Sequence, residues 1–254
     1  MLNTSSATVL PVAADTRALV VVRSSNRAAI FQTQLEERLT LAQLGGDGRL
    51  DVEVRWFGSN AESLRVLLLR MDATERRRFV AAGYEQQYDG CQLLGEPEIS
   101  DDRRHNQLTI RARFALPLLA RALGEQWAVA FAANLGDALE IPALHGRRFA
   151  LALPSYPLTH RYQVEMIWPE GMTIDDEPAS PPWETEHVRL LTTRSVRGNT
   201  EMRTIEFSAK VGEVSAGEVL QLAAELAEIE ARVGGVMTAS GRRPDNTTPR
   251  ADPP

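Results

Sequence analysis

The sequence predicts an α+β protein built mainly from antiparallel β-sheet. Several segments alternate apolar and polar residues, the pattern of a strand with one buried face and one wet face. Glycine-rich and asparagine-containing turns separate them, for example at 45–48 and 197–199. Few segments carry apolar residues at helical spacing. We therefore expect two β-sandwich-like units, a few short helices and a C-terminal amphipathic helix.

Composition narrows the classes of partner. The chain has 254 residues, enough for one large or two smaller domains, and a net charge of −6 that argues against a nucleic-acid partner. No run approaches the roughly 18–20 apolar residues of a membrane span. The first residues lack the charged and apolar regions of a signal peptide, so the chain is expected to be cytoplasmic as encoded.

The first β-rich unit is expected over 15–145, after a flexible N-terminus at 1–14. Segment 49–56 alternates strictly, with Leu50 and Val52 on its apolar face. Asn60 is placed to cap a helix over 61–71, and Asp72 has capping-box spacing to Glu75 for a second helix. Segment 107–116 alternates again, whereas 118–139 is ambiguous between helix and strand.

The second β-rich unit is expected over 146–235. It contains an alternating strand at 162–168 and a long hairpin that turns at 197–199. Ser215 and Glu218 have capping-box spacing for a final helix. The apolar stripe of that helix is Val219, Leu222, Ala223, Leu226 and Ile229. The polar, proline-rich tail at 236–254 is expected to be disordered.

Reactive residues are scarce. The sharpest enzymatic hypothesis is a cysteine hydrolase or acyl-transferase with Cys91 as nucleophile, His105 as base, and Asp101 or Asp102 orienting the base. Such a thiol is commonly activated at a helix N-terminus, but Cys91 precedes an extended segment, and His105 lies in a charged stretch typical of a hairpin turn. We therefore favour an unreactive thiol and a solvated turn, and expect no catalytic residues.

No cofactor or metal is expected. The four histidines, His105, His145, His160 and His187, have no partner at metal-ligand spacing. The carboxylates at 175–177 lie beside prolines and are interpreted as a solvated loop.

One aromatic residue is a candidate for partner contact. Trp183 follows two prolines, and an exposed aromatic in a proline-rich loop can anchor a partner protein. The alternatives are packing against the sheet, or a role in a small-ligand or glycan-binding β-sandwich. A concave polar pocket around Trp183 would favour the glycan hypothesis.

The order of several segments resembles a known architecture. The segments are "DGRLDVEVRWFGSNAESLRVLLLRMDATERRRF", "DDRRHNQLTIRARFALP", "LPSYPLTHRYQVEMIWPEGM" and "IEFSAKVGEVSAGEVLQLAAELAEI". Together they resemble the β-rich accessory region that follows the catalytic core in bacterial proteins with a transglutaminase-like domain. The positions that match that pattern are Gly58, Ala61, Leu64, Arg65, Asn106, Leu108, Pro169 and Gly171.

The catalytic core of that family is absent. Its cysteine, histidine and aspartate match no residues here, since Cys91 falls inside the accessory region. The resemblance implies a non-catalytic module that binds a transglutaminase-like or peptidase-like protein, or a protein substrate of one, through sheet edges or loops. It also implies the periplasm or cell envelope if the chain is a truncated member of the family.

Overall fold

A computed structural model describes residues 6–9, 20–23, 32–133, 148–153, 159–178 and 180–241. Most of it is strand, with three helices in the described ranges, so the predicted α+β class dominated by antiparallel sheet is confirmed. The helices are α1 (Gly58–Leu69), α2 (Ala73–Gln87) and α3 (Val219–Glu230).

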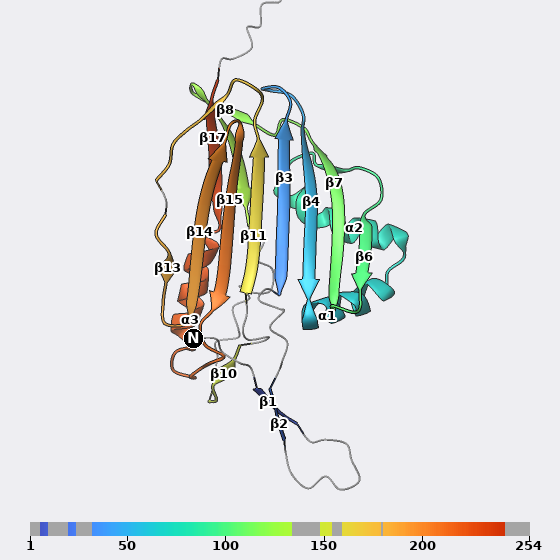
Figure 1. The fold of residues 1–254 in the computed structure, drawn as a ribbon, viewed down its shortest axis with the longest axis vertical. Helices are drawn as coiled ribbons and strands as arrows, with labels where there is room; N and C mark the ends of the chain where they lie inside the picture. Colours follow the sequence, from blue (N-terminus) through green and yellow to red (C-terminus); the bar gives the residue numbers. More distant parts are fainter. Residues whose placement is uncertain are drawn as a thin grey trace, which may run out of the picture.

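A nine-stranded main sheet organises the molecule (Figure 1). Its order is β13-β14-β15-β11-β3-β4-β7-β5, and β6 also pairs with β7. The strands are β3 (Thr33–Leu41), β4 (Gly48–Phe57), β5 (Gln92–Leu93), β6 (Glu98–Asp102), β7 (Gln107–Leu116), β11 (Thr159–Ile167), β13 (Trp183–Glu184), β14 (Val188–Arg197) and β15 (Thr200–Ala209). All of its pairings are antiparallel except that of β3 with β11.

A four-stranded sheet of order β12-β17-β9-β8 lies behind the main sheet (Figure 1). It comprises β8 (Arg121–Leu123), β9 (Gln126–Ala132), β12 (Thr173–Ile174) and β17 (Gly234–Ser240). Two isolated pairs complete the described strands: β1 (Ser6–Val9) with β2 (Val20–Arg23), and β10 (Leu151–Ala152) with β16 (Glu213–Val214). The segment that was ambiguous between helix and strand thus contains the β8–β9 hairpin.

The predicted division into two sandwich-like units near 140–150 is wrong. β3 pairs with β11 from His160↔Thr33 to Ile167↔Thr40, and β9 pairs with β17, so both halves of the chain build both sheets. Local alternation identifies a strand but does not reveal its neighbour, which here is more than a hundred residues away. The boundary at 235 is also wrong, because β17 continues to Ser240; residues 242–254 lie outside the described ranges.

Most alternation patterns are confirmed. Leu50 and Val52 of β4 are buried, and the β14–β15 hairpin turns between Arg197 and Thr200 as predicted. The predicted stripe of α3 is entirely buried. Part of the N-terminus predicted to be flexible forms β1; the rest of 1–14 lies outside the described residues.

The capping predictions have mixed outcomes. Asp72 and Glu75 form the predicted capping box of α2. Asn60 caps nothing, because α1 already begins at Gly58. Ser215 and Glu218 are hydrogen-bonded, but they close the turn before α3, which begins at Val219 after its N-cap Glu218.

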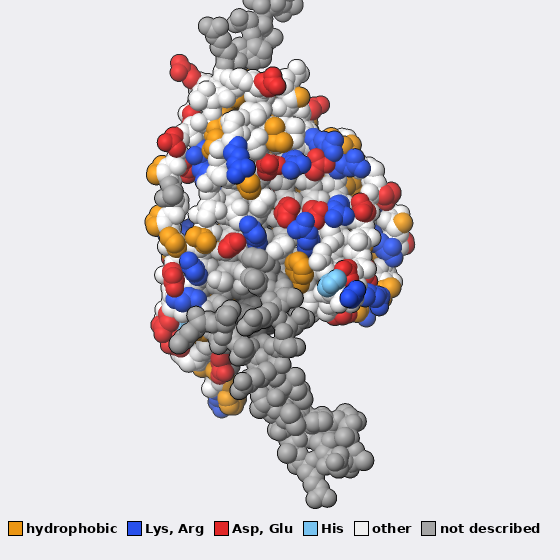
Figure 2. Space-filling view, viewed as in Figure 1, with side chains coloured by type: hydrophobic (Ala, Val, Ile, Leu, Met, Phe, Trp, Pro, Cys, Tyr) orange, Lys and Arg blue, Asp and Glu red, His pale blue; other side chains and the backbone are white. Residues whose placement is uncertain are grey.

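One core lies between the main sheet and the layer behind it. The largest fully buried side chains include Trp168, Tyr162, Phe114 and Phe207. A smaller cluster joins α1 to β7 through Leu64, Leu68, Leu108 and Ile110, among others. The other face of the main sheet carries interspersed acidic and basic side chains (Figure 2). The main sheet therefore has a buried inner face and a polar outer face.

Candidate functional site

The proposed cysteine site is not assembled. Cys91 lies beside β5, whose Gln92 pairs with Ala115 near the end of β7, whereas His105 precedes Gln107 at the start of β7. At about 3.4 Å per residue, these two ends of β7 are roughly 27 Å apart. Cys91 is 7% exposed and belongs to the core, and burial raises the pKa of its thiol to about 11. A thiol in this state is a poor nucleophile at neutral pH.

His105 belongs to the β6–β7 hairpin turn. Its Nδ1 lies 2.7 Å from Asp102 Oδ2, and its backbone N–H donates to Asp102 Oδ1 at 3.1 Å. The hydrogen bonds from His105 hold the pKa of the Asp102 carboxyl below its usual value. Asp101 instead accepts hydrogen bonds from Arg65 and Arg103. The stretch is a charged, exposed hairpin turn, as predicted.

Trp183 lies on the short outermost strand of the main sheet. It is half-buried and packs against the core, and the guanidinium carbon of Arg232 lies 5.6 Å from its ring centroid. The two hollows described on the surface do not include Trp183 in their lining, and the glycan-binding hypothesis stays a prediction. A contact between Trp183 and a partner protein stays a prediction.

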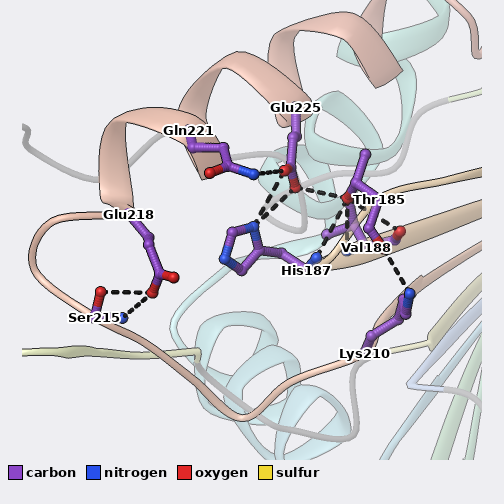
Figure 3. Close-up of polar contacts among 8 residues, drawn as sticks. All are labelled: Thr185, His187, Val188, Lys210, Ser215, Glu218, Gln221 and Glu225. Atoms are coloured by element: carbon purple, nitrogen blue, oxygen red, sulfur yellow. Dashed lines mark hydrogen bonds and ion pairs between the residues drawn. The ribbon is translucent and has the colours of Figure 1, made fainter.

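A buried polar cluster connects the β13–β14 turn to α3 (Figure 3). His187 and Glu225 are 3% and 7% exposed, and His187 Nδ1 lies 3.1 Å from Glu225 Oε2. The Thr185 hydroxyl donates to the same Oε2 at 2.7 Å, and Gln221 donates to Oε1 at 3.0 Å. These bonds outweigh burial and keep the pKa of Glu225 below its usual value, so the carboxylate is ionised at neutral pH.

This histidine–carboxylate pair resembles the base and orienting acid of a hydrolase, but the two hydroxyl groups drawn with it in Figure 3 are each hydrogen-bonded to a carboxylate. The Ser215 hydroxyl, also drawn in Figure 3, donates to Glu218 Oε2 at 2.5 Å. The Thr185 hydroxyl is occupied by Glu225. Its hydrogen bonds join the turn between β13 and β14 to α3.

Removing the carboxylate of this cluster is expected to be costly. Glu225→Ala leaves His187, Thr185 and Gln221 without their shared acceptor, and we expect the free energy of unfolding to fall by about 3 kcal/mol. Urea denaturation measures the change. The matched control is Glu228→Ala on the same helix, whose exposed pair with Arg232 is expected to contribute at most about 0.5 kcal/mol. Equal effects in the two variants would contradict a structural role for the cluster.

The strand that this cluster fixes is only partly hydrogen-bonded along its outer edge, and the segment leading into β13 runs on that side (Figure 1). β14 has ten residues, all paired to β15, but its outer side pairs with β13 only at Arg189 and Leu190. The Val188 carbonyl accepts the Thr185 N–H at 3.0 Å on that outer side. The backbone N–H and C=O groups of a strand alternate in direction from one residue to the next. The groups that point outward, like those of Val188, are therefore also those of Thr192, Arg194 and Val196. Within the described residues, no backbone hydrogen bond to these three is found on the outer side.

The opposite edge of the main sheet is less suited to pairing with another chain. β6 has five residues, including Glu98, Asp101 and Asp102, and charged residues on a short edge strand disfavour strand addition. The part of β14 without an outer partner among the described residues runs from Thr192 to Arg197 and contains two threonines, a serine and a valine besides its two arginines. Val196 is 42% exposed. Threonine and valine favour strands, which suits an edge that accepts another strand.

The outer face of the main sheet is hollowed over its centre. A shallow depression of about 520 Å³ is lined mainly by charged side chains. Most are paired to one another, including Arg38 with Glu165, Arg49 with Asp51 at 2.6 Å and Arg111 with Glu53 at 2.5 Å. Such exposed pairs contribute little to stability, and the face is interpreted as solvated.

Comparisons with known proteins identify no relative: no family model matches the chain, and neither does any curated protein. In the ranges that the structure describes, no three histidine, cysteine or acidic side chains are grouped to hold a metal ion. None of the described helices is long and apolar enough to cross a membrane.

Proposed function

We propose that this protein is a non-catalytic binding module that accepts an extended segment of a partner protein at the open edge of β14. The observation that supports this most directly is the unpaired outer side of β14 from Thr192 to Val196. Backbone hydrogen bonds from the added strand supply affinity, and side-chain contacts on alternate residues supply specificity. The family resemblance suggests a transglutaminase-like or peptidase-like protein, or a protein substrate of one, as the partner.

The surroundings of β14 favour this mode of binding. Strand addition requires an edge that is already in place, since ordering a flexible edge on binding reduces affinity. The hairpin with β15 fixes one side of β14, and the Thr185–His187–Glu225 cluster fixes its beginning. The adjacent Lys210 adds a hydrogen bond from Nζ to the Thr185 carbonyl at 2.5 Å.

Proline substitutions test the proposal. Thr192→Pro and Val196→Pro each remove an outward N–H that the fold does not use, so thermal unfolding should show a folded protein. Partners are captured from extracts of the source cells with the unmodified protein, then titrated against each variant. We expect each proline to weaken binding at least about tenfold, through lost backbone bonds and a blocked edge.

The matched control is Thr193→Ala, which changes an exposed side chain of β14 and leaves the outward backbone groups intact. Its affinity should stay within about twofold of the unmodified protein. A captured partner that binds both folded proline variants as tightly as the control would overturn the proposal.

A further inference from the structure

A carboxylic acid is enclosed within the core. Glu37 lies on the inner face of β3 between Leu35 and Leu39, and only 3% of it is exposed. Its neighbours in register are apolar on both sides, Val52 of β4 and Val164 of β11. An isolated charge at such a position is costly unless it is paired.

The groups that act on Glu37 are tyrosines from two elements. The Tyr162 hydroxyl on β11 donates to Glu37 Oε2 at 2.7 Å, and Tyr84 on α2 also hydrogen-bonds the carboxyl. Tyr88 and Cys91 are the further titratable groups that interact with this cluster, and Glu85 acts in turn on Cys91. No cation is among the groups that set the charge state of Glu37 in the described chain.

Burial therefore dominates the ionisation of Glu37. It raises the pKa of this carboxyl from 4.5 to about 7, and the two phenol hydrogen bonds only partly oppose the shift. Burial also raises the pKa of Cys91 to about 11 and those of Tyr84, Tyr88 and Tyr162 above their usual values. Glu37 is thus the one group of this cluster that changes its charge near neutral pH.

The helix over Glu37 is lightly held. Ala81 is the one fully buried side chain among the fifteen residues of α2, all of which are described. Tyr84 and Tyr88 are partly buried and pack against the core, and the Tyr84 ring lies 4.7 Å from that of Phe114. Arg77 donates to the carbonyls of Leu93 and Gly95. The contact between α2 and the main sheet is therefore made by Val80 and Ala81 together with Tyr84, one of the tyrosines that enclose Glu37.

We propose that Glu37 acts as a pH-sensitive latch: when its buried carboxyl is protonated, α2 stays closed on the main sheet, and when it ionises, α2 opens to let water reach the carboxylate. The proposal does not depend on the binding edge at β14, which lies at the other side of the sheet. Opening exposes the core beside β5 and β7, where Cys91 is buried.

The sign of the effect follows from proton linkage. A carboxyl with a higher pKa in the closed form binds its proton more tightly there, so protonation favours closure. The closed form is most stable below about pH 4.5 and loses stability as the pH rises through about 7, above which the effect levels off. Because each unit of pKa is a factor of ten, the equilibrium for opening should rise by about two orders of magnitude across this interval.

The single cysteine of the chain reports on opening. Its labelling by a pyridyl disulfide, which reacts at acidic and neutral pH, is measured in the unmodified protein and in Glu37→Gln, which stays uncharged. At each pH, the labelling rate of the unmodified protein is divided by that of Glu37→Gln, because this ratio cancels the effect of thiol ionisation on both rates. We expect a ratio that rises about a hundredfold between pH 4.5 and 7.5 and is flat above it. A ratio that does not change with pH would overturn the latch.

A second variant separates local opening from global unfolding. Cys91→Ala with Ala223→Cys moves the thiol to α3, at a position that is also 7% exposed. In that background, Glu37→Gln should leave the pH profile of labelling unchanged. If labelling at residue 223 follows Glu37 as strongly as labelling at Cys91 does, the carboxyl controls global stability and the proposed latch on α2 is wrong.

Discussion

Replacing Glu201 with alanine is expected to reduce the free energy of unfolding by about 3–5 kcal/mol, the usual cost of breaking a buried ion pair from one side. Glu201 is fully buried on β15, and its Oε1 accepts from Nε of both Arg194 and Arg203 at 2.8 Å. Arg203 also pairs with Glu177 at 2.5 Å and lies over the Phe131 ring at 5.5 Å. The substitution leaves two arginines with too few acceptors inside the protein.

The measurement is urea denaturation, compared with Glu206→Ala on the same strand. Glu206 faces the other side of the sheet and forms a partly exposed pair with Arg161 at 3.5 Å, so its removal should cost less than about 1 kcal/mol. Comparable losses for the two variants would show that the Glu201 network contributes no more than a surface pair.

Trp168→Ala is expected to cost a similar amount, about 3–5 kcal/mol, by creating a large cavity. Trp168 is 1% exposed, and its backbone is tied to the hairpin turn, with its N–H donating to the Asn199 carbonyl at 2.9 Å. The indole N–H, in contrast, has no hydrogen-bond partner in the described structure. Trp168→Phe therefore loses volume but no hydrogen bond, and should cost about 1 kcal/mol.

Thermal and urea unfolding of the two variants test this prediction, with Phe149→Ala as the control. Phe149 is 82% exposed, and its truncation should change stability by less than about 0.5 kcal/mol. A loss for Trp168→Phe as large as that for Trp168→Ala would mean that the indole N–H makes a stabilising bond in solution.

The strands of the main sheet were largely predictable because alternation is a local property. Every inward residue of β7 from Leu108 to Leu116 is buried, as the sequence indicates. The same reasoning identified the β14–β15 hairpin, whose turn residues are adjacent in sequence. Pairing between distant strands was not predictable, since any two alternating strands of similar length are compatible. This is why a single main sheet was divided into two units.

The buried polar residues were missed, although the sequence contains a signal for them. Glu37 interrupts the apolar alternation of Leu35, Leu39 and Leu41, and Glu201 extends backward the inward series of Ile205 and Phe207. A charged residue in phase with an apolar face indicates either the end of the strand or a buried charge. Partners such as Tyr162 or Arg194 decide between the two, and they are brought close only by the fold.

Glu225 illustrates the same limit on a helix. It lies beside the predicted stripe of α3 at Leu222 and Leu226, so periodicity alone allows either a boundary position or a buried one. His187 decides the outcome, and it is contributed by a turn 38 residues earlier. The partner contact predicted for Trp183 stays a prediction, whereas the partly unpaired edge of β14 beside it depends on which strands do not pair, which no local pattern reveals.

Amide hydrogen exchange along β14 tests strand addition most directly. In the free protein, Thr192, Arg194 and Val196 should exchange rapidly, while Thr193 and Ser195, whose amides point toward β15, exchange slowly. Binding of the captured partner should slow the three outward amides at least about tenfold. Outward amides that are already slow in the free protein, or that stay rapid in the saturated complex, would contradict the proposed binding edge.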